Sequence, residues 1–579
     1  MKARYIENLV IVACVSVVTV AVLLPGSPTP LPADAPLEQF SAERAMAVLR
    51  DIASEPHPTG SAAQDTVREL LFQQLQGLGL NPQIQPWTIR TRPWGEEHER
   101  TVVGYNMLVR LSETPSEASS GAILFVCHYD SVAEAPGAGD DGAAVAAFVE
   151  ALRALRYDPP RRNTLVFLFT DGEEIGLLGA KALADEHPWM TEVKLVFNFE
   201  ARGASGESIL FETGSNSGVL VREYAKAVSW PFAFSLGTTV YRHLPHDTDF
   251  SVFRQRGLPG LNFAFIGSGT SYHQASDVPG NLDARSLQHH GSYVLALARH
   301  FGALDLASVV PQAGCEMTFF TLPGNVLLSY AKAWDLWLGY GVVALVVTLV
   351  FLTLAQQLLS VRQLVIGLLL WPFSVVGVGL VIFIPIWLSG RLGQVVSGEP
   401  VTLGTHWFFA SGGLTILGAG CWAASCLCAL AYMLSPSRTV AFAISTAVNW
   451  ALVVIISLQW VAGITHALAW PLLLATVLLT VWLHIPKRKT HKSVSVICVA
   501  GVLLLIFWLS LLRQLHQVGS VHPLFSVAID AAGLAFVGPF FFPFAEFFSR
   551  GRSWQQLVIL AVTGLVLLTI AVLPLPLDD

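Results

Sequence analysis

The chain has 579 residues, of which 53% are hydrophobic and 13% are charged, and its mean hydropathy is +0.56. Soluble chains average about 25% charged residues, so a large part of this chain must lie in lipid, and its length exceeds one ordinary domain. The net charge of −7 and the lack of a basic stripe with interleaved aromatic residues argue against nucleic acid as a partner.

The first 36 residues predict a membrane anchor and a linker. Lys2 and Arg4 precede an apolar span over about residues 6–24, and a proline-rich stretch follows at 27–36. A cleaved signal peptide is the alternative. No small-residue cleavage site follows the span cleanly, so an uncleaved anchor is preferred.

Residues 37–306 predict a water-soluble α/β domain, a three-layer α/β/α arrangement around a central, mostly parallel mixed sheet. Short β-rich runs bounded by turn residues alternate with segments of helical spacing, which is typical of such a sheet. We expect helices from Ser41, over 64–78 and over 142–155. We expect strands over 105–111, 122–127, 164–170, 193–199 and 258–266.

Residues 307–579 predict a membrane domain, so the whole chain would have about nine spans. Eight apolar stretches are each near the ~20 residues that a bilayer requires: 334–355, 364–389, 406–434, 439–460, 466–485, 493–512, 525–547 and 554–574. Lys and Arg gather in the loops on one side, which predicts that this side is cytoplasmic and that the α/β domain is not. The periplasmic face of a bacterial inner membrane is favoured over a vacuolar or endoplasmic reticulum membrane, since no Asn-x-Ser/Thr site occurs. The cysteines predict no disulfide framework, because five of the seven lie in membrane-type apolar runs and only Cys127 and Cys315 remain for the soluble part.

Chemistry-bearing side chains follow several of the predicted strands. The run after residue 127 contains His128, Asp130, Asp140 and Asp141 in a turn rich in Gly and Pro. Imidazole and carboxylate ligands suit zinc, a carboxylate can bridge two ions, and a nearby Asp can fix the orientation of a metal-binding His.

Three further clusters follow other strands. Glu173 and Glu174 are adjacent, which suits one metal ligand and one general base, or simply an acidic helix start. Glu200 ends an apolar strand and, taken alone, could be an ordinary surface acid. Tyr272 and His273, taken alone, could be packing residues.

Together the clusters predict a metal site. Because the carboxyl ends of the strands carry the site in such sheets, we expect these side chains to meet. The candidate ligands form a balanced set for two zinc ions and leave Glu173 free for proton transfer. They are His128, Asp140, Glu174, Glu200 and His273.

The segments HYDS, PGAGDDG, DGEEIGLLG, NFE and YHQASD resemble those of the di-zinc aminopeptidase family, which includes secreted bacterial aminopeptidases, glutamate carboxypeptidase II and glutaminyl cyclase. The layout resembles its membrane branch, the endoplasmic reticulum metallopeptidase and the vacuolar membrane protease. Segments beginning at Pro56, Tyr105 and His246 also resemble that branch. The likeness of motifs covers about residues 45–300.

The resemblance implies a zinc metallopeptidase, expected to be an aminopeptidase acting on peptides. It implies that His128 and Glu200 hold one zinc, that Glu174 and His273 hold the other, and that Asp140 bridges them. Glu173 would be the base, Tyr272 would stabilise the oxyanion, and Asp130 would orient His128. Asp141, Asp277, Asp171 and Asp247 are candidates for supporting positions. This chain has Asp140-Asp141 where many relatives have Asp-Asn, and Ala143-Ala144 where they have Ser-Gly.

Two rival functions use the same scaffold, a glutaminyl-cyclase-like acyltransferase with one zinc and a non-catalytic receptor or chaperone subunit. The full ligand set argues against both. A transporter with a peptidase-like regulatory domain stays open, as do the substrate, the role of the membrane domain and the oligomeric state.

Overall fold

The structure is a computed structural model, and it describes residues 27–112, 121–242, 246–309, 314–369 and 440–484, with 504, 507, 510 and 511. The chain divides into two compact units. One comprises Gly26–Thr321 and Asn325–Lys332, and the other contains the described apolar helices. The predicted boundaries at 36/37 and 306/307 stay predictions, although the compact unit continues past residue 306 into a short hairpin.

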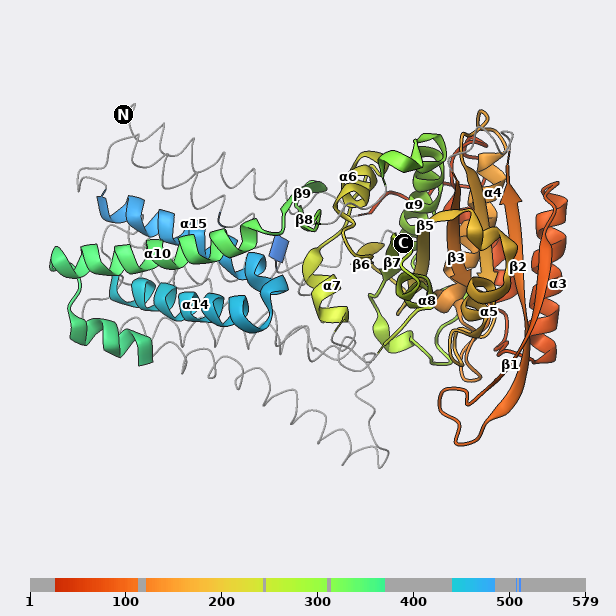
Figure 1. Cartoon of the computed structure of the whole chain (residues 1–579), viewed down its shortest axis with the longest axis horizontal. Helices are drawn as coiled ribbons and strands as arrows, with labels where there is room; N and C mark the ends of the chain where they lie inside the picture. Colours follow the sequence, from red (N-terminus) through yellow and green to blue (C-terminus); the bar gives the residue numbers. More distant parts are fainter. Residues whose placement is uncertain are drawn as a thin grey trace. The chain divides into compact units, whose positions relative to one another are not determined.

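Helices and strands alternate along the first unit, and the labels are those of Figure 1. The helices are α2 (Ala42–Ile52), α3 (Ala62–Gly77), α4 (Ala143–Leu155), α5 (Leu178–Glu186), α6 (Gly218–Ala227), α7 (Ser235–Tyr241), α8 (Asp249–Gln255) and α9 (Ala284–Ala303). The strands are β1 (Gln83–Thr91), β2 (Arg100–Leu111), β3 (Ala122–His128), β4 (Thr164–Thr170), β5 (Val193–Ala201), β6 (Ile209–Thr213), β7 (Gly260–Phe265), β8 (Met317–Leu322) and β9 (Val326–Ala331).

Seven of these strands form one mixed sheet in the order β1-β2-β4-β3-β5-β7-β6. The central strands β4, β3, β5 and β7 are parallel, whereas β1, β2 and β6 pair antiparallel to their neighbours. From β3 the chain goes first to β4 on one side and then to β5 on the other. The sheet therefore has a switch point beside β3, and open α/β sheets carry their ligand sites at the carboxyl edge of such a point.

The sheet lies between two helical layers, which confirms the predicted three-layer α/β/α fold (Figure 1). Alternate side chains of β3 point to opposite faces: Ile123 and Phe125 pack with α2, α3, α4, α6 and α9. Leu124 and Val126 pack with α5 and α8. Since β3 is buried on both faces, it reads in the sequence as one continuous apolar run.

The predicted helices and strands are confirmed with ends shifted by at most two residues, except that β2 begins at Arg100, five residues before the predicted start. Helix α2 begins after Ser41, whose side chain accepts a hydrogen bond from the Arg44 amide. Strand β4 has the predicted bounds, and β5 continues two residues past 199, which brings Glu200 into the strand. The edge strands β1 and β6 were not predicted, and β1 contains Pro86, which an edge strand tolerates.

In the second unit, three described helices are long and apolar enough to cross a membrane: Trp334–Ala355, Ala441–Trp460 and Thr465–Leu483. They belong to α10 (Trp334–Ala355), α14 (Val440–Trp460) and α15 (Thr465–His484), which pack against one another (Figure 1). These agree with three of the predicted spans. The predicted anchor at 6–24 and the spans at 406–434, 525–547 and 554–574 lie outside the described residues, as do most of 364–389 and 493–512.

Candidate metal centre

The site begins where β3 ends. His128 is the last residue of this strand, and its side chain is 1% exposed. Its Nδ1 lies 2.9 Å from the backbone oxygen of Asp130, so a proton on Nδ1 is held there and Nε2 is left free. Nε2 lies 3.2 Å from Asp140 Oδ1 and 3.6 Å from Glu200 Oε2.

Asp140 stands between two imidazoles. While its Oδ1 faces His128, its Oδ2 lies 3.0 Å from His273 Nε2. The turn that carries Asp140 is fixed by Asp277, whose carboxylate accepts hydrogen bonds from the amides of Gly139 at 2.7 Å and Asp140 at 3.2 Å. Asp277 therefore positions the central carboxylate rather than joining the cluster itself.

Glu174 completes the other side of the cluster, with its Oε2 3.1 Å from His273 Nε2. Glu173 and Glu174 lie in the turn between β4 and α5, several residues before the helix begins. The acidic-helix-start interpretation of this pair is therefore not supported. Glu173 is 7% exposed, so its carboxyl is enclosed in the same acidic cluster.

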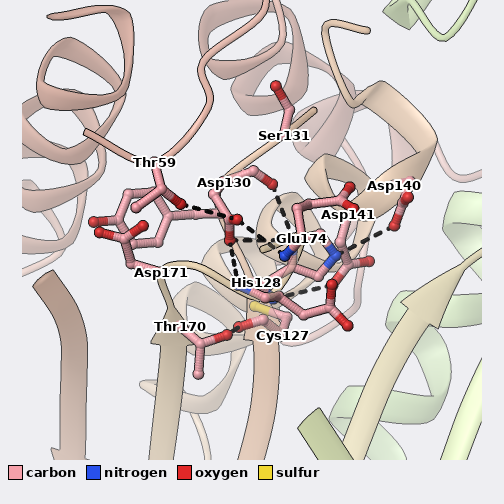
Figure 2. A network of polar contacts seen from close by, with 12 residues as sticks. Thr59, Cys127, His128, Asp130, Ser131, Asp140, Asp141, Thr170, Asp171 and Glu174 are labelled. Atoms are coloured by element: carbon pink, nitrogen blue, oxygen red, sulfur yellow. Dashed lines mark hydrogen bonds and ion pairs between the residues drawn. The ribbon is translucent and has the colours of Figure 1, made fainter. Parts of the chain in front are cut away.

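Asp130 connects the turn that carries Glu173 and Glu174 to His128. Its Oδ1 accepts a hydrogen bond from the Glu173 amide and its Oδ2 accepts one from the Glu174 amide, both at 3.2 Å. Oδ1 also lies 3.5 Å from His128 Nδ1. Figure 2 shows Asp130 between Thr59, which donates a hydrogen bond to it, and the turn that carries Glu174. One buried carboxylate thus orients side chains that follow two different strands.

The electrostatics of the cluster demand positive charge. Burial raises the pKa of Glu173 well above its usual range and raises that of Glu174 to about 8. Burial lowers the pKa of His273, but hydrogen bonds to Asp140 and Glu174 outweigh it and raise that pKa to about 10. His128 behaves likewise through Asp130, Asp140 and Glu200, and its pKa is raised. Either protons or cations must therefore balance these carboxylates.

The donor set fits metal ions. Two groups of side chains each bring one potential donor atom within 4.8 Å of the others: His128, Asp140 and Glu174, and His128, Asp141 and Glu200. Buried oxygens of Glu174 and Asp141 also lack a hydrogen-bond partner among the described residues. Imidazole nitrogen with carboxylate oxygen is a zinc-type donor set, and a bound cation would satisfy those oxygens.

Each predicted residue has a definite place. His128, Asp140, Glu174, Glu200 and His273 come together, with Asp130 and Asp277 supporting them. Asp141 accepts a hydrogen bond from the His128 amide at 3.2 Å, and its carboxylate belongs to one of the two donor groups. Asp171 is buried and accepts from the Tyr105 amide at 2.8 Å. Asp247 is exposed.

Tyr272 stacks on the imidazole of His273, with ring centroids 3.8 Å apart and planes inclined by 18°. Burial and the charges of Asp140, Glu174 and Glu173 raise the pKa of its phenol, so it keeps its proton. The side chain of Tyr272 is thus a neutral hydrogen-bond donor beside the acidic cluster.

Three supporting residues were not predicted from the sequence. Thr59 contacts Asp130, Gln64 donates a hydrogen bond to Asp171, and Asp249 accepts one from Thr170 (Figure 2 shows the threonines). Asp249 is 1% exposed, and burial raises its pKa to about 7. Thr59 and Asp249 lie inside segments that resemble the membrane branch. The resemblance therefore marked these segments but did not indicate what the two residues do.

Residues 106–298 match the model of Peptidase family M28. The chain is 35% identical to mouse endoplasmic reticulum metallopeptidase 1 over 247 residues, which cover 42% of this chain and 27% of that protein. It is 34% identical to the vacuolar membrane protease of Candida dubliniensis over 257 residues, 42% of this chain and 26% of that one. The matched region therefore spans about a quarter of each relative.

Solved structures are similar at lower identity. A zinc aminopeptidase from Bacillus subtilis is 15% identical with a TM-score of 0.38, over 49% of this chain and 98% of that chain. The glutaminyl cyclase of Porphyromonas gingivalis is 17% identical with a TM-score of 0.35, over 45% of this chain and 98% of that chain.

Proposed function

We propose, because residues 106–298 match the model of Peptidase family M28, that this chain is a membrane-anchored metallopeptidase that uses two zinc ions and removes amino-terminal residues from peptides. The observation that carries the proposal is Asp140, whose two carboxylate oxygens face His128 at 3.2 Å and His273 at 3.0 Å. A carboxylate so placed can bridge two metal ions. The names of the two relatives support peptide hydrolysis at a membrane.

In this proposal His128 and Glu200 would hold one zinc, Glu174 and His273 would hold the other, and Asp140 would be a ligand of both. Zinc bound there would supply Lewis-acid activation of water and of the scissile carbonyl. The protein holds the donors in place through Asp130 and Asp277, which fix the turns that carry Glu174 and Asp140.

Glu173 acts as the general base. It is enclosed, it is adjacent to Glu174, and its raised pKa suits a group that accepts a proton from the attacking water and returns it to the leaving amine. Tyr272 keeps its proton and donates a hydrogen bond to the oxyanion of the tetrahedral intermediate. The adjacent carboxylates therefore have different tasks.

The test of this function is product analysis. The full-length protein in detergent, loaded with zinc, is incubated with a peptide library, and the products are sequenced. We expect single amino-terminal residues to be released and about two zinc ions per chain by elemental analysis. One zinc with cyclised amino-terminal glutamine would instead support the acyltransferase, and zinc binding without products would support a non-catalytic subunit.

We also propose that the peptidase domain lies outside the cytoplasm, in keeping with the charge asymmetry of the loops. A cysteine at the exposed position Glu69 on α3 should react with a membrane-impermeant maleimide in intact cells, and one at Thr490 should not. The parent chain gives the background labelling of native cysteines. The reverse pattern would place the domain in the cytoplasm.

A further inference from the structure

Arg202 carries a positive charge beside the acidic cluster, two residues after Glu200. Its guanidinium carbon lies 5.0 Å from the centre of the Tyr272 ring, and the same ring stacks on His273. The Tyr272 ring therefore contacts both Arg202 and His273, which is a member of the cluster. Nothing in the proposed reaction uses this charge.

Within the part of the chain that the structure describes, the Arg202 guanidinium has no carboxylate within ion-pair distance and no hydrogen bond. Two half-buried arginines of the domain are ion-paired instead: Arg254 with Glu212 at 3.1 Å, and Arg153 with Glu150 at 2.7 Å. A guanidinium presents several donors in a planar fork that matches a carboxylate. Arg202 is half-buried, so its donors are available to a ligand that enters the site.

The backbone beneath Arg202 is rigid. Its amide donates to the Phe265 oxygen at 3.0 Å, and the amides of Ala204 and Ser205 donate to the Gly267 oxygen at 2.9 and 3.0 Å. A Cβ at Gly203 would lie 2.1 Å from that same oxygen, so only glycine permits this close approach. A side chain mounted on a fixed backbone recognises a ligand at a small entropic cost.

We propose that Arg202 determines specificity by binding a carboxylate of the substrate. The carboxylate is either the terminal carboxylate of a short peptide or an acidic side chain next to the scissile bond. The proposal rests on the proposed peptidase function and adds a preference for peptides that carry a negative charge near the amino-terminal residue. Through the Tyr272 ring, Arg202 lies next to His273, whose side chain is 34% exposed and is thus the more accessible imidazole of the cluster.

Calorimetry with the zinc-loaded, full-length Glu173→Gln protein tests the proposal without turnover. Three ligands are compared: leucyl-leucine, leucyl-leucinamide and the α-amide of leucyl-aspartate. We expect at least one of the two ligands that carry a carboxylate to bind about 10–100-fold more tightly than leucyl-leucinamide. Tight binding of leucyl-leucine alone identifies the terminal carboxylate, and tight binding of the aspartyl amide alone identifies the side chain.

The Arg202→Met substitution should remove this difference and leave the affinity for leucyl-leucinamide unchanged. Arg202→Lys should keep a part of it, and Arg50→Met, an exposed site on α2, should keep all of it. Equal weakening of all three ligands by Arg202→Met would show that Arg202 merely holds Tyr272. That result overturns the proposal, and so does the lack of a carboxylate preference in the Glu173→Gln protein that keeps Arg202. If the Glu173→Gln protein binds in the expected pattern but the protein that keeps Glu173 cleaves no peptide, the peptidase function alone is contradicted.

Discussion

The two imidazoles that face Asp140 lie in different surroundings. The inner half of the cluster, His128 and Glu200, comes from the ends of two central strands, and the His128 side chain is 1% exposed. The outer half, Glu174 and His273, comes from loops, and the His273 side chain is 34% exposed. His273 also has a φ of 56°, a left-handed conformation that is uncommon for residues other than glycine.

The two halves therefore meet two different requirements of a hydrolytic site, a fixed geometry of the metal ligands and access for the substrate. The inner half is part of the folded core, so its geometry is fixed together with the sheet. The outer half is open to solvent on one side, so it can admit substrate next to Tyr272 and Arg202. We infer that the inner half contributes chiefly to stability and metal affinity, and the outer half chiefly to substrate binding and turnover.

The largest effect should come from Glu173→Gln, which removes the proton acceptor but keeps the size of the side chain. General acid–base contributions are typically about 10²–10⁴-fold, so kcat should fall by at least 100-fold. Zinc content and melting temperature should stay near those of the parent. The matched Glu174→Gln variant should instead lose zinc from the outer half. If both variants lose zinc alike, the two carboxylates have been assigned wrongly.

Removing each imidazole tests the contrast between the halves directly. His128→Ala leaves buried carboxylates without a partner, and breaking such a buried pair costs about 3–5 kcal/mol of unfolding free energy. His273→Ala should cost much less, because its surroundings are partly hydrated. Thermal unfolding and zinc analysis measure both. Equal losses of melting temperature would contradict the division into a structural inner half and an open outer half.

The sequence predicted the members of the cluster because each lies at or beyond the carboxyl end of a predicted strand. Parallel strands bring their carboxyl ends to one edge, so His128, Glu173 and Glu200 had to meet once the strands were recognised. The continuous apolar runs of β3 and β4 made those strands easy to locate. Motif resemblance then supplied roles that periodicity alone does not give.

The supporting contacts were harder to predict, since they depend on tertiary packing. Asp247 and Asp249 are two residues apart and chemically identical, yet the first is exposed and the second is buried against Thr170. Helix α8 begins at Asp249 and packs against the sheet, which decides the difference. The sequence did not single out Arg202 either. What distinguishes this residue is that its guanidinium has no ion-pair or hydrogen-bond partner among the described residues, which only the folded structure reveals.

A smaller effect is expected from Asp130→Asn, which keeps the shape of the group that joins the halves. Asn can accept from only one of the Glu173 and Glu174 amides and lacks the charge beside His128 Nδ1. Loss of such a supporting group typically costs 10–100-fold in metal affinity, and zinc titration against a competing chelator measures it. Thr59→Val, which removes one hydrogen bond to Asp130, is the milder control. An unchanged affinity would show that each half is held independently.

The smallest effect concerns His290, which is buried among apolar side chains next to the inner half. Phe199, which precedes Glu200, packs edge-on against His290 with ring centroids 4.9 Å apart. Burial, with a smaller contribution from His289, lowers the pKa of His290 to about 3. The unfolded chain therefore binds a proton below about pH 6.5 that the folded domain does not bind until about pH 3.

Stability should consequently fall as the pH drops through this window, by at most about 1.4 kcal/mol per pH unit from this group. His290→Asn keeps a polar side chain near Ser208, which lies 2.8 Å from His290 Nδ1, but it cannot titrate. The melting temperature of this variant should fall less between pH 7 and pH 5 than that of the parent. His98→Asn, at an exposed position, should follow the parent. If the melting temperatures of the two variants and the parent have the same pH dependence, burial does not keep His290 neutral. The apolar packing next to the inner half would then not exclude a proton from this imidazole.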